Sequence, residues 1–183
     1  MASLLLLAVL TAGSVGLKPL LGLEWNLHFQ LLSVALGLGT LILSDILSHG
    51  LLRLLGGRPY QAYYRAFVEY FRPQRTFHII IGAALAAGEE LFFRGILLEG
   101  WLTRTHLHPA LGVCISAVLF AVAHFLPRRP LAGYALSALW TGILLGGIYL
   151  FFGSLLVVMW VHVLHDGLGF SLFAFQRRSG WLL

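Results

Sequence analysis

Six long apolar segments follow one another along this chain of 183 residues. Each has close to the ~20 residues that a helix needs to cross a lipid bilayer. Only 10% of the residues are charged, whereas a typical soluble domain has about 25%. The mean hydropathy of the chain is +0.88. We therefore expect an all-α, polytopic integral membrane protein with about six transmembrane helices, forming a single transmembrane domain over residues 1–183. The predicted spans are Ser3–Leu23, Phe29–Leu55, Phe77–Leu102, Ala110–Leu126, Leu131–Phe152 and Ser154–Phe175.

The basic residues are distributed unevenly between the loops that connect these segments. If the N-terminus is cytoplasmic, nine arginines fall on the cytoplasmic side and only Lys18 and Arg104 fall on the other. Cytoplasmic loops of membrane proteins are rich in Lys and Arg. Both termini are therefore expected in the cytoplasm. Since the basic residues are not gathered in one patch, nucleic-acid binding is not expected.

The segment Arg58–Arg75 combines aromatic residues with arginines and separates the second and third spans. This composition is typical of a helix that lies at the membrane interface, where long arginine side chains reach the headgroups. We predict such a helix here, in contact with the lipid bilayer.

Charged residues inside the third span indicate a functional site. Glu89, Glu90 and Arg94 lie in an apolar region, where one charged side chain costs ~2.5–3.5 kcal/mol even on the most permissive scale. Glu90 and Arg94 are four residues apart, so they can form an ion pair along one helix face. Glu89 is rotated by about 100° from Glu90 and points elsewhere. The spacing therefore offers no ion pair that would account for Glu89 in this apolar span.

Two further polar groups occur at helical spacing in later spans. His124 follows Phe120 by four residues, and Asp166 follows His162 by four, with His165 between them. A poorly solvated carboxylate near a histidine can act as a general base on water, and groups on another helix can stabilise negative charge that develops in the reaction. These residues therefore predict a hydrolytic site inside the membrane. The same side chains also permit zinc binding by His124, His162 and a glutamate.

The three patterns, in this order on successive apolar segments, closely resemble those of the CAAX protease and bacteriocin-processing (CPBP, or Abi) family. They read here as Glu89-Glu90-Leu91-Phe92-Phe93-Arg94, Phe120-Ala121-Val122-Ala123-His124 and His162-Val163-Leu164-His165-Asp166. The resemblance covers a catalytic core of residues 77–175. It implies an intramembrane endopeptidase that cleaves a membrane-anchored protein or peptide, such as a prenylated or sorting-signal-bearing C-terminus.

By the same resemblance, Glu89 activates the attacking water with help from His124, and Glu90 pairs with Arg94. His162 and Asp166 would stabilise the oxyanion. Many relatives carry Asn at the last position, and an ionised Asp166 cannot donate a hydrogen bond, so it would be protonated or act through His162. The resemblance favours a glutamate mechanism without a cofactor over a zinc-dependent one. The short chain is similar to the small bacterial members, which implies a bacterial inner (plasma) membrane.

Two other functions use the same residues. Intramembrane Glu, His and Asp also build proton relays, so a proton-coupled transporter or channel is an alternative. A non-enzymatic immunity or assembly factor on the same scaffold is another. The remaining polar residues are interpreted as structural: Asp45, His49 and Glu99 lie near span ends, and His106 and His108 lie in a loop.

Overall fold

A computed structural model describes residues 26–70, 76–102, 105–125 and 132–179 of the chain. The predicted first span lies outside these residues. All the regular elements of the described part are helices, which confirms the all-α prediction there. Its six helical segments are α3 (Leu27–Tyr70), α4 (Thr76–Glu90), η1 (Leu91–Leu102), α5 (Pro109–Phe125), α6 (Ala132–Phe152) and α7 (Leu155–Ser179).

Three of the described helices are long and apolar enough to cross a membrane. These spans are Leu27–Arg58, Ala135–Phe152 and Leu155–Gln176, whereas the apolar helix Pro109–His124 is shorter. The prediction of about six spans is thus confirmed only in part. Apolar side chains face outward from these helices, as expected for contact with lipid, and examples are Leu43, Leu119, Phe151, Trp160 and Phe175. The protein is an integral membrane protein.

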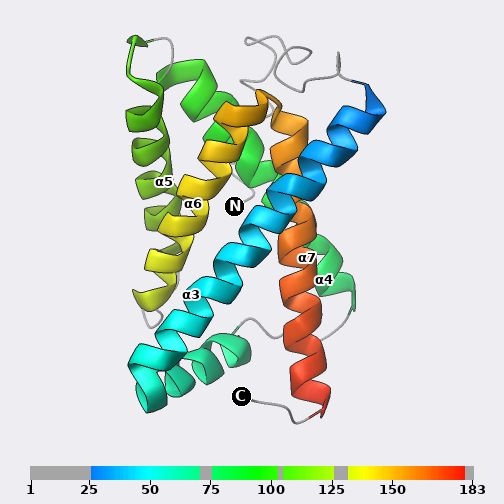
Figure 1. Ribbon diagram of the computed structural model, residues 1–183, viewed down its shortest axis with the longest axis vertical. Helices are drawn as coiled ribbons and strands as arrows, with labels where there is room; N and C mark the ends of the chain where they lie inside the picture. The colour runs from blue at the N-terminus through cyan, green and yellow to red at the C-terminus, as the bar shows by residue number, and fades with distance from the viewer. Residues whose placement is uncertain (1–25, 71–75, 103–104, 126–131, 180–183) are drawn as a thin grey trace.

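The long helix α3 is bent at Gly57. This residue has φ 49° and ψ −121°, a conformation that glycine adopts without the steric penalty of a Cβ atom. Figure 1 shows α3 crossing α6 and α7 obliquely before the segment after the bend turns sharply away. Residues 58–70 thus form a separate helical segment where we predicted an interfacial helix. Tyr64 on this segment is buried, and its hydroxyl donates a hydrogen bond to Gln176 of α7 at 3.1 Å.

The predicted third span is found as two consecutive helices. After Glu90 the α-helical hydrogen bonding of α4 changes to the π-helical pattern of η1. Such i→i+5 turns are rare, and they often lie at functional sites. One carbonyl of η1, that of Phe93, accepts a hydrogen bond from the Ser116 hydroxyl of α5 at 3.0 Å. The change of helix type therefore falls between Glu90 and Arg94, inside the charged cluster.

Small residues allow α5 and α6 to approach closely. A Cβ atom added to Gly142 would lie 3.1 Å from the Cα of Ala117, and one added to Gly146 would lie 2.7 Å from a methyl carbon of Val113. The Gly-x-x-x-Gly spacing thus serves packing within the chain. A tight turn then joins α6 to α7. Gly153 has φ 62°, and Ser154 caps α7 by accepting a hydrogen bond from the Val157 amide at 3.3 Å.

Candidate active site

Arg94 and Glu90 form a fully buried ion pair. Their side chains have no solvent exposure, and Arg94 Nη1 lies 2.7 Å from Glu90 Oε1. The other terminal nitrogen of Arg94 donates to the carbonyl of Gly142 at 2.8 Å, and the guanidinium carbon lies 5.1 Å from the centre of the Phe120 ring. The sequence spacing predicted this pair, and the structure confirms it. Arg94 thereby joins η1 to α5 and α6 while neutralising Glu90.

Glu90 also contacts a histidine from the last helix. His162 Nδ1 lies 2.7 Å from the same Oε1 atom that Arg94 contacts. An ionised carboxylate only accepts hydrogen bonds, so His162 carries a proton on Nδ1. The sequence placed Glu90 with Arg94 alone, so this contact from α7 was missed. It turns Nε2 of His162 toward the cavity, where Asp166 Oδ1 lies 3.7 Å away.

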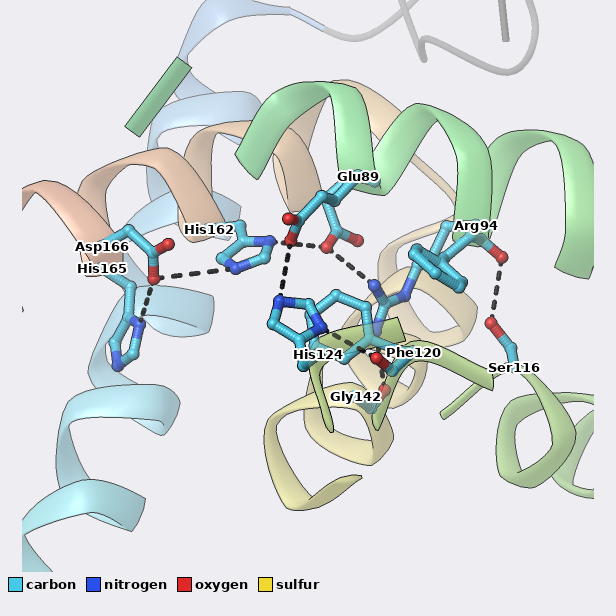
Figure 2. Close-up of polar contacts among 11 residues, drawn as sticks. Glu89, Arg94, Ser116, Phe120, His124, Gly142, His162, His165 and Asp166 are labelled. Atoms are coloured by element: carbon cyan, nitrogen blue, oxygen red, sulfur yellow. Dashed lines mark hydrogen bonds and ion pairs between the residues drawn. The ribbon is translucent and has the colours of Figure 1, made fainter. Parts of the chain in front are cut away.

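Glu89 faces a different histidine, as its rotation from Glu90 predicts. Its Oε2 atom lies 3.6 Å from His124 Nε2, and the two side chains have 12% and 11% exposure. His124 Nδ1 lies 2.8 Å from the carbonyl oxygen of Phe120. Because a carbonyl can only accept, Nδ1 carries a proton and Nε2 is the atom directed to Glu89. Figure 2 shows Glu89 and Arg94 extending to different partners around Phe120.

Asp166 lies between two histidines. Besides His162, it contacts His165, whose Nδ1 lies 3.4 Å from Asp166 Oδ1. His165 Nε2 in turn lies 2.7 Å from Oδ2 of Asp45, on α3. Figure 2 shows His165 and Asp166 on the side of His162 opposite to Arg94. The six residues from Arg94 to Asp45 thus form one continuous chain of polar contacts across four helical segments.

Asp45 corrects one sequence interpretation. We took it for a structural residue near the end of a span, but it lies well inside the span Leu27–Arg58 and lines the cavity beside the site. The signal was present, because Asp45 and His49 repeat the four-residue spacing of the other polar pairs. The structural interpretation fits two other residues. Glu99 accepts a hydrogen bond from Tyr149 at 3.2 Å, and His108 caps the start of α5.

A cavity of about 590 Å³ opens beside these groups. Its lining includes His124, His162 and Asp166 at one end, and His49, Tyr60, Tyr64 and Gln176 among its other polar residues. From His162 to Gln176 the cavity follows α7 for 14 residues, or ~21 Å at 1.5 Å per residue. Between these ends the walls are mainly apolar, formed by Ile42, Ile46, Leu168, Phe170, Leu172 and Phe173. The shape and lining suit an elongated, largely apolar ligand.

The arrangement does not match a zinc centre. Within the described residues, no group of three or more His, Cys, Asp or Glu side chains is placed to hold a metal ion. Nδ1 of His162 is directed to Glu90, and Nε2 of His124 to Glu89, so these two nitrogens lie against different carboxylates. We therefore derive no step through a metal.

Comparison with protein families identifies the family of this chain. Residues 72–168 match the family of type II CAAX prenyl endopeptidases described as Rce1-like. The match covers more than half of the chain and includes Glu89, Arg94, His124 and His162. The chain belongs to this family.

Membership of the Rce1-like family indicates an intramembrane protease that acts on a protein substrate. Comparison with curated proteins and with solved structures gave no match. The family match ends at Leu168 and begins after α3, so it does not include Asp45.

Proposed function

We propose that this protein hydrolyses a peptide bond in a membrane-anchored protein or peptide, with water activated by Glu89 as the nucleophile. One observation carries the proposal, which is the different surroundings of two adjacent carboxylates. Glu90 is fully buried and lies 2.7 Å from both Arg94 and His162, whereas Glu89 is 12% exposed and lies 3.6 Å from His124, which lines the cavity. A poorly solvated carboxylate beside a histidine that lines a cavity is suited to accept a proton from water.

The distance between Glu89 and His124 fits this role. At 3.6 Å, it exceeds the usual length of a direct hydrogen bond, and a single water molecule can contact both groups. Glu89 takes one proton from that water, and the hydroxyl adds to the carbonyl carbon of the scissile bond. The proton then passes to the departing amine as the carbon–nitrogen bond breaks. Both protons of the water and its oxygen are thus accounted for.

His162 and Asp166 lie on the other side of the reacting position in this proposal. A donor at His162 Nε2 requires a ring protonated on both nitrogens, and the carboxylates of Glu90 at 2.7 Å and Asp166 at 3.7 Å lie beside that ring. The donor would then face the oxyanion that forms when water adds. Phe120 packs beside both histidines, with ring-centre distances of 4.2 Å to His124 and 6.0 Å to His162.

The cavity supports a membrane-anchored substrate. An apolar space of ~21 Å along α7 accommodates a lipid chain or an extended apolar peptide segment. The nearby catalytic groups would then reach the peptide bond next to that segment. We propose that both termini of the protein are cytoplasmic, because nine arginines fall on that side of the predicted spans and only Lys18 and Arg104 fall on the other.

The experiment compares the cleavage rates of glutamate and histidine variants in proteoliposomes. The substrate is a quenched fluorescent peptide with a prenylated cysteine near its C-terminus, and the same peptide without the lipid serves as comparison. Glu89→Gln and His124→Ala are expected to lower kcat by about 10²–10⁴, the usual contribution of general acid–base groups. Glu99→Gln is the matched control, because Glu99 lies on η1 and bonds to Tyr149. It should keep kcat within about twofold.

A metal chelator in the same assay separates the two mechanisms. We expect the wild-type rate to be unchanged after treatment with 1,10-phenanthroline. Loss of activity that added zinc restores would reject the glutamate mechanism. A folded Glu89→Gln protein that cleaves as fast as the Glu99→Gln control would reject the proposed function itself.

A further inference from the structure

A carboxylate outside the family match is joined to the active site. Asp45 on α3 contacts His165 at 2.7 Å, and His165 contacts Asp166 at 3.4 Å. We propose that Asp45 is a positioning residue of the active site: through His165 it holds a proton beside Asp166. This inference rests on the proposed function, because it assigns a task to Asp166 in the same reaction.

The contacts of His165 fix the number of protons that it shares with Asp45 and Asp166. An ionised carboxylate only accepts, so the short contact to Asp45 places a proton on His165 Nε2. A hydrogen bond at the other nitrogen then needs one more proton, carried either by His165 Nδ1 or by Asp166 Oδ1. The three residues therefore share two protons. One of them lies between His165 and Asp166.

That second proton solves a problem specific to an aspartate at this position. A bare carboxylate repels a developing oxyanion and cannot donate a hydrogen bond to it. With a proton held between His165 and Asp166, the charge of Asp166 is compensated, and Asp166 can lie beside the oxyanion together with His162. Asp45 is needed because it fixes the orientation and the protonated nitrogen of the His165 ring, as second partners of catalytic histidines commonly do.

The simplest alternative is that the contact between Asp45 and His165 only holds α3 and α7 together. A neighbouring hydrogen bond allows this structural role to be distinguished from the proposed role in the active site. Ser44, adjacent to Asp45, accepts a hydrogen bond from the Trp140 indole of α6 at 2.6 Å. This bond also ties α3 to the helix bundle, but it does not involve Asp166. Ser44→Ala thus tests the loss of a helix–helix hydrogen bond from α3 without a change at the active site.

The decisive variant is Asp45→Asn, which keeps the shape of the side chain. An amide at this position can donate to His165 Nε2, so the ring keeps only its Nδ1 proton, becomes neutral and no longer places a positive charge beside Asp166. We expect kcat for the prenylated peptide to fall by about 10–100-fold, with KM within about twofold of wild type. Ser44→Ala should keep kcat within about twofold. His165→Gln, which cannot hold the shared proton, should lower kcat like Asp45→Asn and serves if that variant does not fold.

The background Asp166→Asn provides the critical comparison. An asparagine donates hydrogen bonds without a shared proton, so this variant should retain activity within about tenfold of wild type, and Asp45→Asn or His165→Gln should then lower kcat by less than about twofold. An equal fall in both backgrounds, an equal fall in Ser44→Ala, or a folded but inactive Asp166→Asn protein would overturn the inference.

Glu89→Gln is measured in the same assay. If it is inactive while Asp45→Asn is fully active, only this inference fails, whereas an active Glu89→Gln protein rejects the function.

Discussion

Two adjacent glutamates provide the sharpest test of how charge is organised in this membrane protein. Replacing either residue by Gln exchanges one carboxylate oxygen for an amide nitrogen and removes one negative charge. The two positions are adjacent in the chain. The structure predicts opposite consequences. Glu89→Gln should remove activity and leave the fold intact, whereas Glu90→Gln should destabilise the fold.

The magnitude follows from the partners of each carboxylate. Oε1 of Glu90 accepts contacts of 2.7 Å from both Arg94 and His162, and neither Glu90 nor Arg94 is exposed. Without the Glu90 charge, Arg94 is left buried with the Gly142 carbonyl as its polar contact. Breaking a buried ion pair from one side costs about 3–5 kcal/mol. The contact of Glu89 with His124 is 3.6 Å, longer than either contact of Glu90, so replacing Glu89 should cost less stability than replacing Glu90.

Unfolding in mixed detergent micelles, followed by circular dichroism, measures the difference. Glu90→Gln should lower the free energy of unfolding by several kcal/mol more than Glu89→Gln. The double variant Glu90→Gln with Arg94→Gln should be more stable than Arg94→Gln alone, because it leaves no unpaired charge. Equal stability of the two single variants, or strictly additive losses in the double variant, would refute this account of the ion pair.

Two glycines give further predictions. Gly146→Leu should destabilise the protein by about 1–3 kcal/mol, because the new Cβ would lie 2.7 Å from Val113, whereas Gly147→Leu meets open space and should change little in the same unfolding assay. A rise in stability for Gly146→Leu would contradict the close packing of α5 and α6. Gly169 lines the cavity and an added Cβ has no neighbour within 4 Å, so Gly169→Leu should leave the fold intact and raise KM for the prenylated peptide more than for the lipid-free one. Equal effects on both peptides would show that the lipid does not occupy this part of the cavity.

Local spacing accounts for what could be predicted from the sequence. Apolar length located the helices, because a membrane span needs a continuous run of hydrophobic residues. The four-residue interval from Glu90 to Arg94 places both side chains on one helix face, and the 100° step sends Glu89 to another. The second span was predicted to end at Leu55, and the structure bends two residues later, at Gly57.

Contacts between helices could not be predicted in this way. His162 is 72 residues from Glu90, and His165 is 120 residues from Asp45. Their meeting depends on which helix faces pack together, and packing between apolar helices depends on small residues and on shape, which leave no periodic pattern of charge. The π-helical turns of η1 have no sequence signal that we could identify. Each of the misjudged contacts is therefore one between distant helices.

The position of Asp45 also bears on the extent of the catalytic unit. The predicted core of residues 77–175 contains Glu89, His124 and the α7 residues, but it excludes α3. The structure gives α3 two connections to the cavity, through Asp45 to His165 and through Tyr64 to Gln176. In a membrane, a charged or polar side chain without its partner is costly, so His165 inside the core and Gln176 just beyond it both depend on α3. Exchanging α3 for an apolar helix of equal length should therefore reduce activity even where the protein still inserts, and activity equal to wild type would confine the catalytic unit to residues 77–175.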